Sequence, residues 1–179
     1  MKKDRNKANQ DLLEWYDALI FALLVLVLTF TFAVRVVAVS GNSMEPTLSW
    51  NDRLLIQSNF YTPARGDVVV LDGYIDWGKP LVKRVIGCEG DVVEVDGETG
   101  SVYVNGERLE ETYIAETTLI EGDVAYPLTV PEGCIFVMGD NRNHSTDSRF
   151  SSVGCVDSRD VLGRVLLRIF PVSEFGRIE

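Results

Sequence analysis

An uninterrupted apolar run near the N-terminus constrains this chain more than any other feature. Residues 18–34 (ALIFALLVLVLTFTFAV) carry no charge, and their only polar side chains are two threonine hydroxyls, which can hydrogen-bond to their own helix. Arg35 follows, and its long side chain can extend to a membrane interface. As a helix, residues 18–39 would measure about 33 Å, enough to cross a hydrocarbon core of about 30 Å. We therefore predict one transmembrane helix over residues 18–39.

The basic residues around this run predict its orientation. Four lysines and arginines lie within the first seven positions, whereas Arg35 and Arg53 are the only ones in the first stretch after the run. This bias places residues 1–17 in the cytoplasm and residues 40–179 outside it, as in a single-pass protein of the cell membrane. A signal peptide cleaved near Ser40 is the alternative, but the apolar run exceeds the usual length of about 7 to 15 residues.

Composition and charge exclude several classes of protein. Hydrophobic residues make up 46% of the chain and charged residues 25%, which is typical of a folded protein rather than a disordered one. The net charge of -10 would repel a polyanion, so we expect no nucleic-acid partner. The chain has 3 cysteines, which cannot all pair with one another. A disulfide between Cys134 and Cys155 stays open, because sequence does not fix their distance.

Short β-branched runs separated by turn residues follow the apolar segment. These runs are residues 53–57, 67–71, 81–86, 91–95, 101–104, 134–138 and 163–170. Their spacing predicts a mainly β fold for the exported part of the chain. Asn105 and Gly106 supply the positive φ angles that a type I′ hairpin turn requires. Residues 110–133 have no clear period, so their structure stays open.

Two residues could together form a nucleophile and its base. Ser43 follows the apolar run, and the nearby Pro46 stiffens its turn, which suits a fixed and exposed hydroxyl. Serine becomes a good nucleophile only when a base takes its proton, and a lysine can do so only when its pKa falls toward neutrality. Lys83 lies in the apolar run 81–86, where burial would lower its pKa. Alternatively, the alternation of a strand would turn Lys83 toward solvent, where it would stay charged.

Hydrogen-bonding side chains are dense in residues 139–149 (GDNRNHSTDSR), after a predicted strand. Such a loop can brace a catalytic site through pairs of carboxylates and arginines. A divalent cation held by Asp140, Asn141, His144 and Asp147 is an alternative, although their spacing fits no standard loop. A second alternative is a serine protease triad, in which His144, the only histidine, activates Ser43 with Asp140 or Asp147 as its partner.

Taken together and in order behind an N-terminal anchor, four stretches resemble the successive boxes of the bacterial type I signal peptidase family. They are SMEPTL (43–48), RGDVVVL (65–71), VKRVIG (82–87) and GDNRNHSTDSR (139–149). The family consists of membrane-anchored Ser-Lys serine proteases that remove signal peptides from exported preproteins. The resemblance covers the anchor and nearly all of residues 40–170. It implies a signal-peptidase-like, β-rich catalytic domain after one N-terminal transmembrane helix.

The resemblance assigns roles to individual residues. It implies that Ser43 is the nucleophile, that Lys83 is its general base, and that the Ser145 hydroxyl orients the lysine. The residues that would support the site are Asp140, Arg142, Asp147, Ser148 and Arg149, with an ion pair between Asp147 and Arg149. The residues that would bind substrate are Met44, Leu48, Val82 and Gly41. Gly41 stands where some family members have a serine that donates a second hydrogen bond to the oxyanion.

The resemblance also implies the partners of the chain. A Ser-Lys mechanism needs no cofactor and no metal, and the expected partners are preproteins with signal peptides and the lipid bilayer. An inactive, membrane-tethered relative that binds signal peptides or serves a surface assembly is the alternative from another class. The presence of both Ser43 and Lys83 favours the enzyme. Whether it serves many substrates or a dedicated few stays open.

Overall fold

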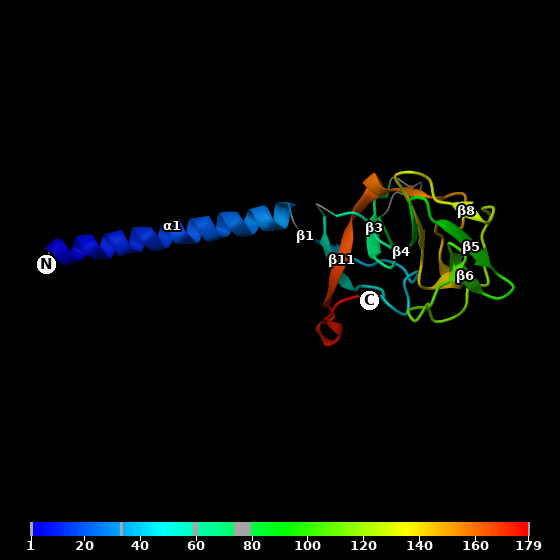
Figure 1. Ribbon diagram of the computed structural model, residues 1–179. Coiled ribbons are helices and arrows are strands. Elements are labelled where there is room, and N and C mark those ends of the chain that lie inside the picture. The colour runs from blue at the N-terminus through cyan, green and yellow to red at the C-terminus, as the bar shows by residue number, and fades with distance from the viewer. Residues whose placement is uncertain (1, 33, 59–60, 74–79, 179) are drawn as a thin grey trace.

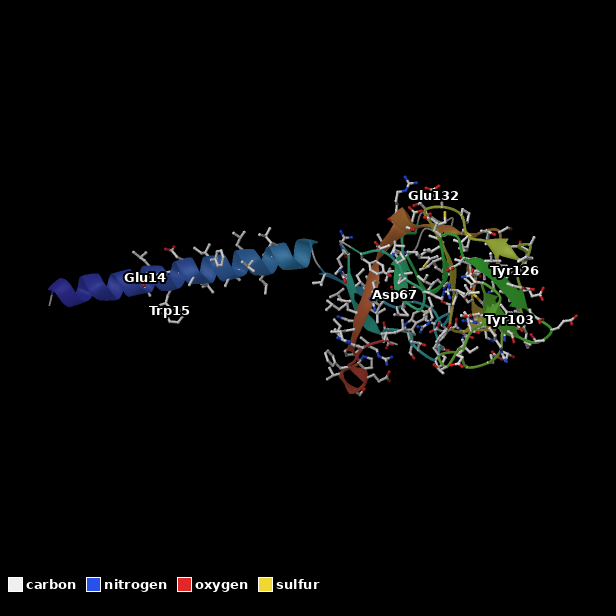
Figure 2. All side chains as sticks on the ribbon, viewed as in Figure 1. Glu14, Trp15, Asp67, Tyr103, Tyr126 and Glu132 are labelled. Carbon is white, nitrogen blue, oxygen red and sulfur yellow. The ribbon has the colours of Figure 1, made fainter. Side chains whose placement is uncertain are left out.

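A long helix is followed by a β domain in the computed structural model, which describes residues 2–32, 34–58, 61–73 and 80–178. Helix α1 (Lys2–Phe32) leads into the β domain and extends away from it (Figure 1). Its Trp15 side chain is 77% exposed, and both Glu14 and Trp15 stand clear of the β domain (Figure 2). Within the part of the chain that the structure describes, no helix has the length and apolarity that a membrane span requires.

The predicted helix over residues 18–39 is wrong at its C-terminal end. Residues Val34–Ala38 form strand β1, which pairs antiparallel with β2 (Arg53–Gln57) and places Val36 opposite Leu55. Three of the five residues in β1 are valines, which favour extended backbone when a partner strand is present. Val37 also packs against the hydrophobic core of the β domain. An apolar stretch can form either a membrane helix or a buried strand. Here the pairing of β1 with β2 determines where the helix ends.

Two sheets make up the β domain, which confirms the mainly β fold. The larger sheet has the strand order β1-β2-β11-β3-β4-β9-β10, and the smaller sheet has the order β7-β6-β5-β8. The remaining strands are β3 (Val68–Leu71), β4 (Leu81–Cys88), β5 (Val92–Asp96), β6 (Ser101–Val104), β7 (Glu107–Arg108), β8 (Leu128–Thr129), β9 (Cys134–Met138), β10 (Val156–Asp157) and β11 (Val161–Phe170). Short 3₁₀ helices occur at η1 (Arg142–His144), η2 (Ser158–Asp160) and η3 (Val172–Glu174).

The predicted strands and one predicted turn are present. Each of the seven β-branched runs contains a strand, and each strand pairs antiparallel with its neighbours. Asn105 and Gly106 connect β6 to β7 with φ angles of 56° and 80°. These angles are those of a type I′ turn, whose twist matches that of the flanking strands. The sequence therefore located this hairpin correctly.

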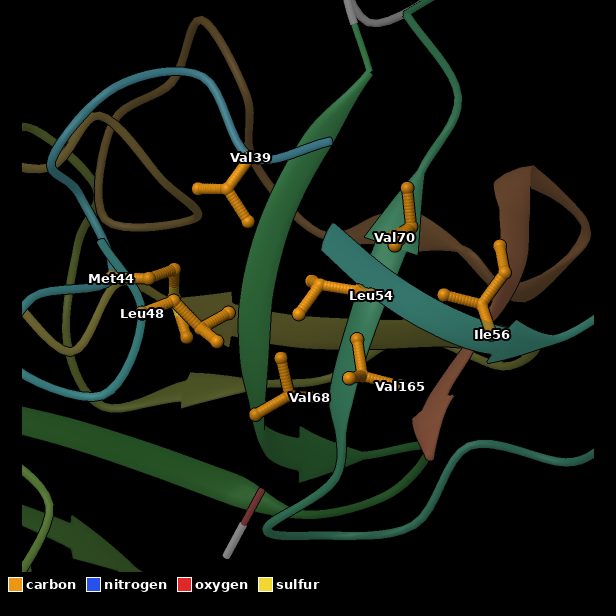
Figure 3. Close-up of a cluster of buried hydrophobic side chains, with 8 residues drawn as sticks. All are labelled: Val39, Met44, Leu48, Leu54, Ile56, Val68, Val70 and Val165. Carbon is orange, nitrogen blue, oxygen red and sulfur yellow. The ribbon is translucent and has the colours of Figure 1, made fainter. Parts of the chain in front are cut away.

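One hydrophobic cluster fixes the loop that carries Ser43. It joins the buried side chains Val39, Met44, Leu48, Leu54, Ile56, Val68, Val70 and Val165 (Figure 3). Met44 and Leu48 come from the loop itself, and the strands β2, β3 and β11 supply most of the others. Burying such side chains contributes about 1.5–3 kcal/mol each, so the loop is anchored on both sides of Pro46.

A second cluster joins the two sheets. Ile86 of β4 and Phe136 and Met138 of β9 pack against the buried valines of β5 and β6. On the other face of β4, Val85 belongs to a third cluster with β3 and β9. Strand β4 is therefore covered on both faces, which determines the environment of Lys83.

The segment left open by the sequence crosses the smaller sheet. Leu128–Thr129 forms β8 beside β5, whereas residues 110–126 have no regular structure and run beside residues 139–149. The cysteines Cys88, Cys134 and Cys155 are all free thiols. Cys134 and Cys155 both pack against the second cluster, and burial raises the pKa of Cys155 to about 11. The possible disulfide is therefore absent from this structure.

Candidate active site

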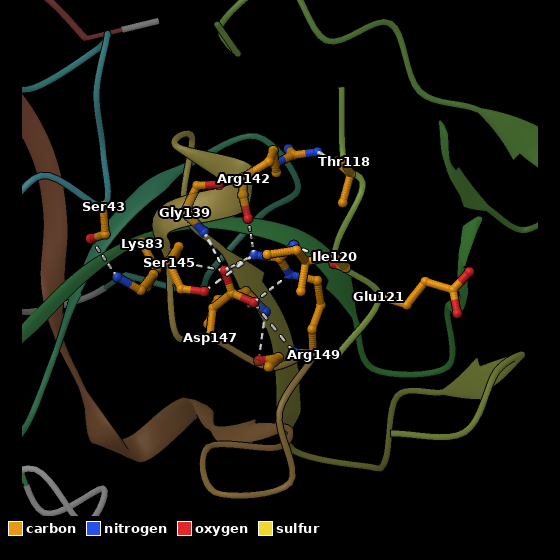
Figure 4. Close-up of polar contacts among 12 residues, drawn as sticks. Ser43, Lys83, Thr118, Ile120, Glu121, Gly139, Arg142, Ser145, Asp147 and Arg149 are labelled. Carbon is orange, nitrogen blue, oxygen red and sulfur yellow. Dashed lines mark hydrogen bonds and ion pairs between the residues drawn. The ribbon is translucent and has the colours of Figure 1, made fainter. Parts of the chain in front are cut away.

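Ser43 and Lys83 meet at the surface of the larger sheet. Lys83 Nζ lies 2.7 Å from Ser43 Oγ and 3.1 Å from the carbonyl oxygen of Val82 (Figure 4). Lys83 is only 2% exposed, because the neighbouring strands and the Ser43 loop cover its position on β4. The solvent-facing alternative for Lys83 is therefore wrong. Alternation predicts a solvent face only when one side of the sheet is open.

The environment of Lys83 lowers its pKa toward neutrality. Burial lowers its pKa to about 8, although the negative charges of Asp147 and Asp140 partly oppose that shift. The positive charge of Arg149 lowers the pKa further. At pH 7 roughly one lysine in ten is then neutral, which is enough to act as a base for a neighbouring hydroxyl.

Ser145 occupies a different hydrogen bond from the one that the resemblance implies. Its hydroxyl donates to Asp147 Oδ2 over 2.7 Å, and its hydrogen bonds in the described residues do not include one to Lys83. The carboxylate of Asp147 is a strong acceptor, which accounts for the direction of the Ser145 hydroxyl proton. Ser145 still lies beside the nucleophile, since a Cβ added at Gly139 would overlap both the Ser145 side chain and the Ser43 carbonyl.

Asp147 is the centre of a buried polar network. It accepts hydrogen bonds from Gly139 N at 2.9 Å and Ser145 Oγ, and it forms the expected ion pair with Arg149, with Nε 2.8 Å from Oδ1. Both members of the pair are fully buried. Ser148 Oγ accepts from Val137 N over 2.9 Å and so joins the same loop to β9. The network fixes the loop that lies behind Lys83.

Asp140 and Arg142 brace the site from the other side. Asp140 accepts two hydrogen bonds from Arg84, whose Nε and Nη2 lie 2.8 Å and 2.7 Å from its carboxylate oxygens. Arg142 donates to the Gly139 carbonyl and to Thr118 Oγ1, each over 3.0 Å, and pairs with Glu111. The predicted supporting residues therefore gather around the pair of Ser43 and Lys83.

Several supporting residues were missed by sequence reasoning. Arg84 was passed over because only Lys83 had an evident chemical role in its strand. Thr47 donates to Asp140, and Asn141 donates to the carbonyls of Ser43 and Asn42. Tyr113, Thr118 and Ile120 lie in the segment without a period, and Arg149 Nη1 donates to the Ile120 carbonyl over 2.7 Å. The only sequence signal for these supporting residues was the density of polar side chains in residues 139–149, which need hydrogen-bond partners.

A small cleft opens beside Ser43. It has a volume of about 100 Å³ and is lined by Val37, Ala38, Val39, Ser40, Ser43, Met44, Pro80, Leu81, Val82 and Lys83. Met44 and Val82 are thus where the resemblance places them. Leu48 is instead fully buried in the core, and Gly41 lies outside the lining with a φ angle of 102°. Apolar side chains therefore line the cleft beside the polar Ser43 and Lys83.

The two alternatives for residues 139–149 are not supported. The His144 side chain is exposed, and the Ser43 hydroxyl is hydrogen-bonded to Lys83 instead. Asp140 pairs with Arg84 and Asp147 pairs with Arg149, so each carboxylate already has a cationic partner. Among the described residues, no group of three or more histidine, cysteine or acidic side chains could hold a metal ion. Neither the triad nor the cation site therefore has support in the described residues.

Known proteins are similar to this chain over almost its whole length. The family described as "Signal peptidase, peptidase S26" matches residues 12–170. Signal peptidase I of Bacillus licheniformis is 35% identical over 189 residues, which cover 99% of this chain and 98% of the relative. Signal peptidase I P of Bacillus subtilis subsp. natto is 36% identical, covering 96% and 95%. A crystal structure of a signal peptidase I from Enterococcus faecalis V583 has a TM-score of 0.49 and 34% identity, covering 58% of this chain and 97% of that one.

Proposed function

The chain belongs to the peptidase S26 family of signal peptidases, and on that premise we propose that it removes signal peptides from exported preproteins with Ser43 as nucleophile and Lys83 as general base. The observation that carries the proposal is the 2.7 Å contact between Ser43 Oγ and the buried Lys83 Nζ. A serine endopeptidase needs such an activated hydroxyl, and here the base is a lysine whose burial lowers its pKa.

The reaction proceeds through an acyl-enzyme. Neutral Lys83 takes the Ser43 proton while Ser43 Oγ bonds to the scissile carbonyl carbon. The lysine ammonium then gives that proton to the leaving amine as the peptide C–N bond breaks. Water then attacks the resulting ester while Lys83 takes a proton from it, and the lysine ammonium passes that proton to Ser43 Oγ as the acid product leaves. Lys83 thus transfers the proton in both halves of the reaction.

The cleft supports cleavage after small side chains. Met44, Leu81 and Val82 give it an apolar lining beside Ser43, and its volume of about 100 Å³ suits small side chains better than large ones. Residues 37–40, at the end of β1, and residues 80–83, at the start of β4, line the cleft. An extended substrate segment suits a cleft that is lined by strand residues.

We propose further that α1 anchors the enzyme in the cell membrane, with residues 1–17 cytoplasmic and the β domain on the opposite side. The support is the exposure of its large apolar side chains, which include Leu19, Ile20, Phe21 and Leu24. A helix that is apolar on every side requires a lipid or protein cover. The anchor would hold the cleft close to the bilayer, where the cleavage site of a membrane-bound signal peptide emerges.

Cleavage of a preprotein tests the proposed function directly. The full chain in detergent is incubated with a preprotein that has an Ala-x-Ala site, and mass spectrometry identifies the new N-terminus. Cleavage at that site should disappear in Ser43→Ala and Lys83→Met and persist in His144→Ala. Loss in His144→Ala with persistence in Lys83→Met would contradict the Ser-Lys mechanism. Signal-peptide binding by a folded wild type that cleaves none of several preproteins would favour the binding-only relative.

A further inference from the structure

Asn141 holds the backbone on both sides of the Ser43 amide. Its side-chain Nδ2 donates to the carbonyl oxygen of Asn42 over 3.0 Å, and its backbone N–H donates to the carbonyl oxygen of Ser43, also over 3.0 Å. Asn141 and Asn42 are separated by 99 positions in the chain. Asn141 itself is buried, so water competes little for these bonds. One residue of the last box therefore fixes two successive peptide groups of the Ser43 loop.

The bond to Asn42 also sets the direction of the Ser43 N–H. Asn42 and Ser43 are joined by a trans peptide, in which the C=O and the N–H lie in one plane and point in opposite directions. Because Asn141 draws the Asn42 carbonyl toward itself, the Ser43 N–H must point away from Asn141. Within the described residues, this N–H donates no hydrogen bond. It is thus an oriented donor, attached to the nucleophilic residue and without a partner.

Such a donor matters because negative charge develops on the substrate carbonyl oxygen next to Ser43 Oγ. Preorganised backbone N–H groups stabilise that oxyanion in acyl-transfer enzymes, and their direction decides their worth. Gly41 has no hydroxyl, so it supplies no side-chain donor two residues before Ser43. Stabilisation of the oxyanion in this chain therefore depends more on the Ser43 N–H.

We infer that Asn141 is a positioning residue for the oxyanion: its carboxamide holds the Asn42–Ser43 peptide so that the Ser43 N–H faces the developing charge. The inference rests on the proposed peptidase function and adds a role that acts through the backbone. Asn141 is not among the residues that line the cleft, and its described hydrogen bonds to the Ser43 loop go to backbone carbonyls rather than to the Lys83 amine. Its loss should therefore leave substrate binding and the base unchanged and slow only the chemical step.

Asn143 is a matched control two residues further on, within the 3₁₀ helix η1 that Asn141 precedes. Its Nδ2 donates to a backbone carbonyl, that of Thr117, over 3.1 Å, and its Oδ1 accepts from Leu119 N over 3.0 Å. It therefore also joins two loops with its carboxamide, but it makes no hydrogen bond to the Ser43 loop. A general loosening of residues 139–149 should affect both variants, whereas loss of the oriented N–H should affect only one.

The test compares Asn141→Ala and Asn143→Ala in the full chain. Steady-state cleavage gives kcat and KM, and binding of a peptide boronate, which mimics the tetrahedral intermediate, is compared with binding of an uncleavable substrate peptide. For Asn141→Ala we expect kcat and boronate affinity to fall about 10- to 100-fold, less than the full loss of a donor, with KM and peptide affinity unchanged. The pH at half-maximal rate should not move. For Asn143→Ala all these values should stay near those of the wild type.

Three outcomes of this comparison would overturn the inference. They are an unchanged kcat in Asn141→Ala, an equal loss of boronate and peptide affinity, and an equal loss of kcat in the two variants. Should Asn141→Ala fold poorly, Asn141→Asp replaces it, because aspartate keeps the side-chain shape but has no N–H donor. This variant is measured on the alkaline plateau of the pH profile, where Lys83 is already neutral and the added charge no longer affects the base. A normal kcat there also overturns the inference. Wild-type cleavage in the same assay tests the proposed function separately. A crystal structure of Asn141→Ala tests the orientation of the Asn42–Ser43 peptide without relying on activity. An unchanged orientation of that peptide group would refute the positioning role.

Discussion

The guanidinium of Arg84 lies 3.9 Å from the ring centroid of Tyr113, and the same arginine forms a bidentate ion pair with Asp140. Tyr113 belongs to the irregular segment 110–126, whereas Arg84 follows Lys83 in β4. Asp140 in turn accepts from Thr47 in the Ser43 loop. A cation over an aromatic face is stabilised by about 0.5–2 kcal/mol, more when water is excluded. The irregular segment is thus part of the support of the site.

Replacing Tyr113 should weaken both the fold and the site. Tyr113→Ala removes a large, mostly buried ring, and we expect the free energy of unfolding to fall by about 3 kcal/mol. Tyr113→Phe should stay within about 1 kcal/mol of the wild type, because the hydroxyl makes only a 3.3 Å contact with Glu111. Urea unfolding of the two variants measures the difference. Equal stabilities would show that the ring contributes nothing to the support of Arg84.

The rate of cleavage should rise with pH as Lys83 loses its proton. The pKa of Lys83 is lowered to about 8 by burial, and only the neutral amine can act as the base. We therefore expect kcat/KM to increase about tenfold per pH unit below pH 7 and to level off above pH 9. A pH profile with a substrate whose own charge is constant provides the measurement. A profile that is flat from pH 6 to pH 9 would contradict a lysine base.

The same burial should make Lys83 costly for stability. In the unfolded chain its pKa returns to its usual value near 10.5, so the folded state holds fewer protons between about pH 8 and pH 10.5. Stability of the wild type should rise through that window, and the full cost of the buried charge should apply below it. We expect Lys83→Met to be inactive and more stable than the wild type by about 3 kcal/mol at pH 6, with the gain shrinking above pH 8. Thermal unfolding at pH 6 and pH 10 tests the sign; a variant less stable at pH 6 would contradict it.

Local sequence patterns predicted the strands but not the supports of the site. The hairpin at Asn105 and Gly106 was predictable because a two-residue turn depends on its own φ angles. Strand β1 was not, because its valines suit a membrane helix equally well until β2 provides a partner. The burial of Lys83 was not predictable from local sequence either, since it depends on the segments that pack over β4. Arg84, Tyr113 and Asn141 depend on contacts between distant segments, which no local period records.

Gly139 should tolerate no side chain, because two groups of the site lie against this position. An added Cβ would overlap the Ser145 side chain and the Ser43 carbonyl, and the latter belongs to backbone that Asn141 holds in place. We therefore expect Gly139→Ala to lower kcat/KM at least 100-fold, since a small displacement of a nucleophile costs about that factor. Gly176→Ala is the matched control, because a Cβ there meets nothing within 4 Å and the backbone has no positive φ. Cleavage assays on the two variants, with circular dichroism to verify folding, make the comparison. A fully active Gly139→Ala would mean that the Ser43 loop is free to move away from residues 139–149, against the close packing described above.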